Sequence, residues 1–158
     1  MDVKRPPGRG LAIAKHHCIT RDGLSATAVH AHAVSLYHEA IWRLPDWKIA
    51  PLVAAQQARV ALGDDIGEAV GANLAVMLIG ERPGLSAADS LGVYLTWQPE
   101  RGRRDCERNC ISNIRPPHGM SYSDAADLLV WLLREARERH LTGVALKDDR
   151  ADPSLWLE

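Results

Sequence analysis

The potentially catalytic or ligand-binding residues of this sequence form few recognisable motifs. A nucleophile elbow of the form G-x-S-x-G, a Walker phosphate loop and a G-x-G-x-x-G motif are all absent from the sequence. One loop has a distinctive composition, because the run G-E-R-P-G at 80–84 directly follows a continuous apolar segment. Ligands of open α/β sheets bind at the carboxyl ends of strands, so Glu81 and Arg82 are candidate binding groups. The competing interpretation, which spacing alone favours, is an exposed turn with a local ion pair.

Histidine and cysteine pairs suggest metal binding, but their spacings argue against it. His30 and His32 are two residues apart, and such neighbours on a helix face different directions. Cys106 and Cys110 lack a second pair of ligands at the spacing of a zinc site, and the run H-H-C at 16–18 stands alone. We therefore expect no metal ligands in this chain and histidines that are exposed or hydrogen-bonded.

Composition excludes several classes of protein. The chain has 158 residues, with 19 basic and 20 acidic side chains and a net charge of −1. It lacks the basic balance of a nucleic-acid-binding protein, and the arginines at 101–108 alternate with acidic residues, as on a solvated surface. No apolar run approaches the roughly 18 residues of a membrane span, and residues 1–15 lack the apolar region of a secretory signal. The odd number of cysteines, three, fits a reducing cytosol, so we expect a cytoplasmic protein. From its charge and its hydropathy, we expect it to bind neither nucleic acid nor membrane.

Three segments are predicted to form helices that would position these groups. The first follows Asp22-Gly23 and ends before Pro45, because the residue before a proline is pushed out of the helical region. The second is expected over 63–71, with acidic residues in its first turn. The third is the most regular, with Ser121 expected to cap its start and Gly143 expected to end it.

Short apolar segments between these helices predict strands. They are expected at 49–55, 74–79, 91–97 and 110–114. In the third of these, alternate residues point in opposite directions, which is typical of a strand. Strands that alternate with helices predict a single-domain α/β fold, with an open, mostly parallel sheet flanked by helices in Rossmann-like layers.

The domain is expected to span residues 22–148. Residues 1–21 are basic and carry no sustained period, so we expect an irregular lead-in that is the least protected part of the protein. Residues 149–158 are expected to form a C-terminal tail. No internal repeat or low-complexity segment divides the chain further.

Several blocks of sequence occur together in one order and carry a specific resemblance. They are D-G-L-S-A at 22–26, R-V-A-L-G-D-D-I-G at 59–67, I-G-E-R-P-G-L-S at 79–86, D-S-L-G at 89–92 and E-R-N-C-I-S-N-I at 107–114. The chain closely resembles the light chain (small subunit) of ethanolamine ammonia-lyase over about residues 22–148. The third and fifth blocks are the most specific.

The resemblance implies an adenosylcobalamin enzyme that converts ethanolamine into acetaldehyde and ammonia by radical chemistry. A large TIM-barrel chain is implied to hold the substrate, and the light chain to complete the cobalamin site without a catalytic residue of its own. The implied cobalamin contacts are Val60 for apolar packing, Glu81 as an acceptor for amide N–H groups and Cys110 as a small polarisable filler. The sequence has no D-x-H-x-x-G signature, so it is not expected to supply a lower axial histidine, in keeping with the base-on class. The implied location is the cytoplasm or the interior of a bacterial microcompartment.

The sequence departs from the family pattern towards its amino end. Family members carry a substantial region before the D-G-L-S block, whereas only about twenty residues precede it here. The run H-H-C-I-T-R at 16–21 is poor as a buried strand, and Q-Q-A at 56–58 replaces the usual glycine before the arginine. Two other hypotheses therefore stand beside the light chain: a truncated remnant with no productive assembly, and a stand-alone α/β module that binds a small molecule.

Overall fold

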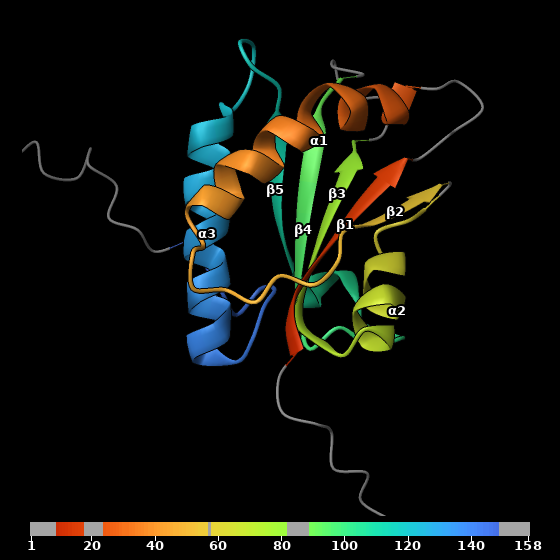
Figure 1. Cartoon of the computed structure of the whole chain (residues 1–158), viewed down its shortest axis with the longest axis vertical. Helices are drawn as coiled ribbons and strands as arrows, with labels where there is room; N and C mark the ends of the chain where they lie inside the picture. The colour runs from red at the N-terminus through yellow and green to blue at the C-terminus, as the bar shows by residue number, and fades with distance from the viewer. Residues whose placement is uncertain (1–8, 18–23, 57, 82–88, 149–158) are drawn as a thin grey trace, which may run out of the picture.

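A five-stranded open sheet with helices on both faces organises the chain in this computed structural model (Figure 1). The structure describes residues 9–17, 24–56, 58–81 and 89–148. The strands lie in the order β2-β1-β3-β4-β5. Along the chain the elements are β1 (Arg9–His17), α1 (Leu24–Trp42), β2 (Val53–Gln56), α2 (Leu62–Ala69), β3 (Ala72–Gly80), β4 (Leu91–Trp97), the 3-10 turn η1 (Asp105–Glu107), β5 (Arg108–Ile114) and α3 (Tyr122–Arg139).

The direction of strand pairing changes in the middle of the sheet. β1 runs parallel to β2 and β3, whereas β4 runs antiparallel to β3 and β5. The connections at 81–90 and 98–107 have ten residues each, fewer than the dozen or more that a parallel crossover needs. The α/β class and the open sheet with flanking helices are confirmed. The expected mostly parallel arrangement is not, because the sheet is mixed.

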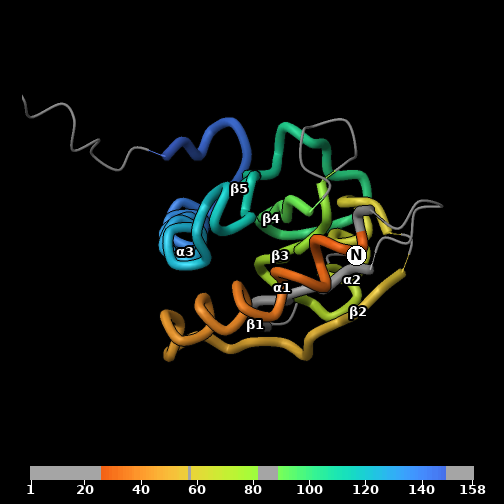
Figure 2. The backbone as a smooth tube through the Cα atoms, turned by 90° about the horizontal axis from the view of Figure 1, so that it is seen from above, coloured from red at the N-terminus to blue at the C-terminus, as the bar shows by residue number. Residues whose placement is uncertain are grey.

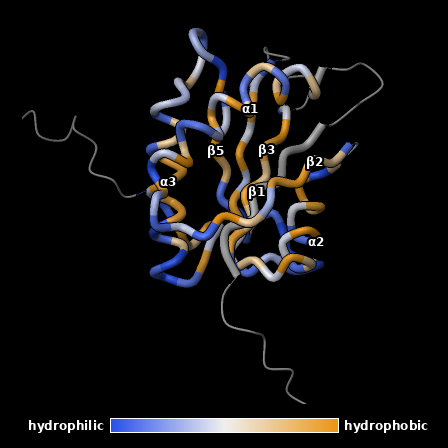
Figure 3. The backbone as a smooth tube through the Cα atoms, viewed as in Figure 1, coloured by the Kyte–Doolittle hydropathy of each residue, from blue (hydrophilic) through white to orange (hydrophobic). Residues whose placement is uncertain are grey.

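Two helices cover one face of the sheet and the third covers part of the other face (Figure 2). α1 packs on β1, β3 and α3, and α3 lies over β4 and β5. α2 lies on the opposite face, mainly against β3 and β1. The main core fills the space between the sheet and the α1–α3 layer, and a smaller apolar cluster lies under α2. Figure 3 shows apolar strands at the centre and hydrophilic stretches towards the outside of α3. None of the described helices is long and apolar enough to cross a membrane.

Most helix boundaries follow the signals in the sequence. The Ser121 hydroxyl accepts a hydrogen bond from the Asp124 backbone N–H at 3.1 Å and caps α3. Gly71, with a φ of 65°, directly follows the last turn of α2. These local signals are sufficient because capping depends on only a few neighbouring residues.

The end of α3 differs from the expectation. The helix ends at Arg139, and His140 takes the left-handed conformation with a φ of 56°. Gly143, which was expected to end the helix, lies three residues further on and has a φ of 88°. A Cβ on Gly143 would lie 2.1 Å from the backbone oxygen of Cys106. This glycine therefore permits a close approach between the chain after α3 and η1.

The segment expected to be irregular contains a strand. β1 pairs with β3 between Arg9 and Lys15 and with β2 between Ala14 and His17. Because β1 is second in the sheet order, both of its edges are paired. The prediction of an irregular lead-in was wrong over these residues. An apolar run of only four residues, at 11–14, is too short to show a period, and pairing on both sides supplies what the local sequence does not.

β2 is shorter than predicted and lies at the edge of the sheet. The strand expected at 49–55 occupies Val53–Gln56, and its side chains alternate between half-buried and exposed. An edge strand has only one paired neighbour and is therefore less covered than a central one. The prediction of a buried strand at 49–55 was wrong in both its bounds and its burial.

Candidate functional site

The three residues that the resemblance implies come from three separate elements. Val60 lies in the turn before α2, Glu81 directly follows β3, and Cys110 lies within β5. Val60 packs on the small apolar cluster under α2, which Tyr94 of β4 also joins. Cys110 is the cross-strand partner of Tyr94, so their side chains share one face of the sheet.

Glu81 approaches the same face beside Tyr94. A Cβ on Gly92 would lie 3.4 Å from Cγ of Glu81 and 3.5 Å from Cε2 of Tyr94. Glu81 and Tyr94 therefore flank one bare stretch of β4, where glycine carries no side chain. We call Val60, Glu81, Tyr94 and Cys110 together the α2-side strip. The structure brings all three implied residues into this strip, whereas Arg82 lies outside the described residues.

Ser90 fixes the position of Glu81 through two hydrogen bonds. The Glu81 backbone N–H donates to the Ser90 backbone oxygen at 2.9 Å, and the Ser90 hydroxyl donates to Oε2 of Glu81 at 2.5 Å. The backbone N–H of Asn113 donates to the same carboxylate oxygen at 3.4 Å. Ser90 itself is only 2% exposed. Among the hydrogen bonds between described residues, none ends on Oε1 of Glu81, so this oxygen is suited to accept one from a ligand.

The two titratable partners of Glu81 in the strip keep their protons at neutral pH. Burial raises the pKa of Tyr94 to about 12, with Cys110 and Glu81 adding to the rise. Burial by surrounding protein atoms also raises the pKa of Cys110, although part of its side chain reaches the surface. The strip thus presents one carboxylate, one neutral hydroxyl and one neutral thiol beside apolar surface.

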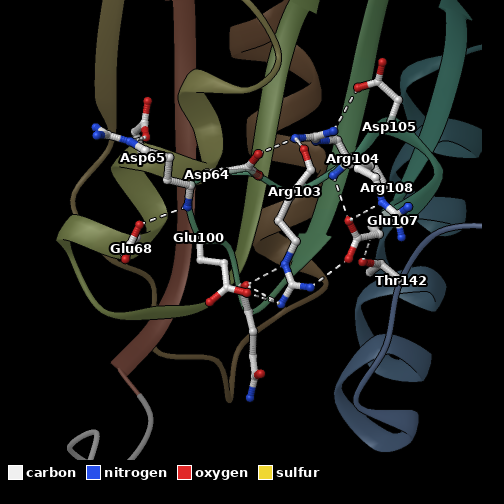
Figure 4. Close-up of polar contacts among 12 residues, drawn as sticks. Asp64, Asp65, Glu68, Glu100, Arg103, Arg104, Asp105, Glu107, Arg108 and Thr142 are labelled. Carbon is white, nitrogen blue, oxygen red and sulfur yellow. Dashed lines mark hydrogen bonds and ion pairs between the residues drawn. The ribbon is translucent and has the colours of Figure 1, made fainter. Parts of the chain in front are cut away.

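A buried ion pair connects α2 to β5 (Figure 4). Asp64, in the first turn of α2, pairs with Arg108 at the start of β5, and both side chains are 2% exposed. Arg108 also donates to Oδ1 of Asp105 at 2.8 Å. Burial raises the pKa of Asp64, and the Arg108 guanidinium opposes that rise. Asp64 follows Val60 by four residues and Arg108 precedes Cys110 by two, so the pair sets the spacing between the elements that carry them.

The charged stretch before β5 is a surface network, as the alternating signs predicted, but the prediction was wrong for Arg108, which is buried because it pairs with Asp64. Arg103 lies 3.3 Å from a carboxylate oxygen of Glu100 and 2.8 Å from one of Glu107. Arg101 reaches across to Asp65 of α2 at 3.0 Å. The contact of Arg101 holds the connection between β4 and β5 against α2 (Figure 4).

The histidines and cysteines considered for metal binding are dispersed in the structure. Nδ1 of the buried His32 lies 2.8 Å from the Tyr122 hydroxyl. Cys106 and Cys110 are free thiols. Within the described ranges, no group of three or more His, Cys, Asp or Glu residues is arranged to hold a metal ion. The run at 16–18 falls partly outside the described residues.

Sequence reasoning did not identify Ser90, Tyr94 or the Asp64–Arg108 pair. Ser90 had one local signal, its place in the D-S-L-G block just before β4. Tyr94 also had a local signal. It alternates with the core-facing residues of its strand, which places its side chain on the opposite face of the sheet. Asp64 and Arg108 are 44 residues apart, and no local pattern indicates that they meet.

The fold and the α2-side strip define a small α/β domain that holds a fixed carboxylate beside a tyrosine and a thiol on a partly covered sheet face. The family described as ethanolamine ammonia-lyase light chain (EutC) matches residues 13–147. The chain belongs to this family, which confirms the resemblance seen in its sequence blocks.

Curated relatives of the chain share one name. Proteins named ethanolamine ammonia-lyase small subunit are 52% identical in Azotobacter vinelandii over 90% of this chain, and 58% identical in Bradyrhizobium diazoefficiens over 83% of it. A protein of the same name in Pseudomonas putida is 50% identical over 97% of this chain. The matched regions are 51%, 51% and 55% of those proteins. The chain therefore spans about half the length of the curated relatives it matches.

Proposed function

We propose that this chain acts in an ethanolamine ammonia-lyase as part of its small subunit, and that the α2-side strip binds adenosylcobalamin. The main observation that supports this proposal is that Val60, Glu81 and Cys110, which lie on three separate elements, meet on one sheet face. Membership of the light-chain family supports this reading. The proposed partner is the large TIM-barrel chain, which would hold the substrate.

The residues of the strip fit the chemistry of the cofactor. Corrin is a broad, partly apolar disc fringed with amides, so its site needs apolar packing and hydrogen-bond partners at the rim. Val60 adds to the apolar cluster of Met77 and Ile79, and Glu81 offers Oε1 as a charged acceptor. Cys110 leaves room for a bulky neighbour because its side chain is small and reaches the surface. The chain's residues would orient the cofactor and exclude water, while adenosylcobalamin supplies the radical chemistry when bound.

The proposed division of labour leaves this chain without catalytic residues. We infer that it converts no ethanolamine to acetaldehyde and ammonia on its own, because substrate would be held by the barrel chain. The proposed location follows that of the complex, either the cytoplasm or a bacterial microcompartment. Two alternative functions are a remnant that does not assemble productively and a stand-alone module that binds a small molecule.

Reconstitution with a large subunit of ethanolamine ammonia-lyase tests the proposed function. The co-purified complex is expected to release ammonia from ethanolamine with adenosylcobalamin, whereas this chain alone is expected to release none. Failure to co-purify would favour the remnant. Binding of cobalamin by the chain alone with unchanged affinity would favour the stand-alone module. Ammonia release by the chain alone would contradict the division of labour.

Glu81 is the residue whose change tests the site itself. Glu81→Ala is expected to weaken adenosylcobalamin binding to the complex by about 1.5–3 kcal/mol, the range for a hydrogen bond to a charged group. Glu81→Gln is expected to lose less, because its carbonyl still accepts, and Cys110→Ala is also expected to lose less than Glu81→Ala. Spectroscopic titration of the cofactor measures all three. Unchanged affinity in Glu81→Ala, with the complex intact, would show that Glu81 only shapes its loop.

A further inference from the structure

Tyr94 lies at the centre of the α2-side strip and approaches each of the three residues proposed to bind cobalamin. It joins Val60 in the apolar cluster under α2 and pairs across strands with Cys110. It flanks Gly92 opposite Glu81, whose charge contributes to its raised pKa. The ring is half-buried, and its apolar body packs within the protein. A tyrosine in this position has a polar tip that requires a partner.

We propose that Tyr94 is a fourth cobalamin-binding residue, and that its hydroxyl and the Glu81 carboxylate together recognise one primary amide on the rim of the corrin. This inference rests on the proposed function, since it assigns the ligand of the same strip. It adds both a contact residue and a chemical basis for selecting an amide over a carboxylic acid.

The donor and acceptor groups of a primary amide match this pair. An amide N–H would donate to Oε1 of Glu81, whose other oxygen is already held by Ser90. The amide carbonyl would accept from the Tyr94 hydroxyl, which keeps its proton because its pKa is about 12. In the chain itself this hydroxyl has the Cys110 thiol as a partner, and a thiol is a weak hydrogen-bonding group. Replacing it by an amide carbonyl therefore strengthens the contact.

The pair also explains how the wrong ligand would be rejected. A carboxylate in place of the amide offers no N–H to Glu81 and brings a second negative charge close to it. Like charges at a partly buried site repel each other more strongly than they do in water. Specificity would thus come from the charge of Glu81, and the Tyr94 hydroxyl would add affinity for either ligand.

Removal of the hydroxyl alone tests the contact. In the complex with the large subunit, Tyr94→Phe keeps the ring and is expected to weaken adenosylcobalamin binding roughly two- to tenfold. Tyr122→Phe is the matched control, because it also removes a single hydroxyl, but one that contacts His32 between α1 and α3. The control is expected to change affinity by less than about twofold. Thermal unfolding of both variants checks that the fold is kept.

A second measurement tests recognition of one amide by both residues. Cobalamins with one side-chain amide hydrolysed to a carboxylate are titrated into the same complex, one isomer at a time. One isomer is expected to bind the wild type more weakly than intact cobalamin does, and Glu81→Gln is expected to reduce that difference. With intact cobalamin, the effects of Glu81→Gln and Tyr94→Phe are expected to be non-additive, since the residues share one ligand group.

Different outcomes separate this inference from the proposed function. If Glu81→Ala weakens binding while Tyr94→Phe matches the wild type, Tyr94 only packs the sheet and the inference is overturned alone. If the two effects are additive and no isomer is rejected, the shared amide is overturned. If the wild-type complex binds no cobalamin, both the inference and the proposed function are overturned.

Discussion

At the scale of single residues, the direction in which Glu81 presents its carboxylate depends on Ser90. The hydroxyl and the backbone oxygen of Ser90 each form a hydrogen bond with Glu81, and Ser90 is buried. A carboxylate with one oxygen held in this way loses less side-chain freedom when its other oxygen meets a ligand. Ser90 is therefore a positioning residue, which acts on a ligand only through Glu81.

Exchange of Ser90 for alanine is expected to weaken cobalamin binding by the complex roughly two- to tenfold, because one hydrogen bond that orients Glu81 is lost. Ser121→Ala is the matched control. It removes the cap of α3 and is expected to lower the stability by about 0.5–2 kcal/mol without changing binding. Cofactor titration measures the loss of affinity expected for Ser90→Ala, and urea unfolding measures the loss of stability expected for Ser121→Ala. Wild-type affinity in Ser90→Ala would mean that Glu81 holds its orientation without Ser90.

At the scale of elements, α2 and β5 are joined by a buried ion pair between Asp64 and Arg108. Asp64 and Arg108 are almost fully buried, yet Oδ1 of Asp64 and Nε of Arg108 have no hydrogen-bond partner among the residues that the structure describes. A buried pair with unsatisfied atoms recovers only part of its desolvation cost. We therefore expect the pair to add little to the net stability. Its main effect would be to fix the distance between the turn that carries Val60 and the strand that carries Cys110.

The single and double variants of this pair separate geometry from stability. Asp64→Leu is expected to destabilise the chain by about 3–5 kcal/mol, since it removes the buried partner of Arg108 and leaves only the exposed Asp105 to face that charge. Adding Arg108→Met is expected to regain most of that loss, because two apolar side chains then replace two charges. Urea unfolding of the wild type and both variants measures this. A double variant no more stable than Asp64→Leu would show that the ion pair itself stabilises the fold.

Elements with long or distinctive patterns were predictable from the sequence, and short ones were not. α3 was located from its apolar stripe and the cap at Ser121, and β3 from the continuous run at 74–79. β1 was missed because its stability comes from strands on both sides rather than from its own residues. The implied residues Val60, Glu81 and Cys110 came from the family resemblance. Ser90 was missed although it lies in the D-S-L-G block, because that block does not indicate a contact with Glu81. Asp64 and Arg108 are 44 residues apart, so no local pattern indicated their pairing.

At the scale of the whole molecule, the parallel half of the sheet supports the half that carries the α2-side strip. β3 lies between β1 and β4, and Glu81 directly follows it. Without β1, one edge of β3 would have unpaired backbone groups as far as Leu78, and the strand that leads to Glu81 would lose its support on that side. The segment that the sequence presents as the weakest is therefore central to the position of the proposed site.

This central placement gives an expectation for amide exchange that opposes the one from the sequence. The amide hydrogens of β1 between Leu11 and Lys15 are expected to exchange nearly as slowly as those of β3 between Leu74 and Leu78, because these strands pair over this stretch. Those of the edge strand β2 are expected to exchange faster, since β2 pairs with β1 alone. Mass spectrometry of peptides after exchange measures the order directly. Fast exchange in β1 beside slow exchange in β3 would show that β3 is stable without its parallel neighbour, and that the position of Glu81 depends on the antiparallel half alone.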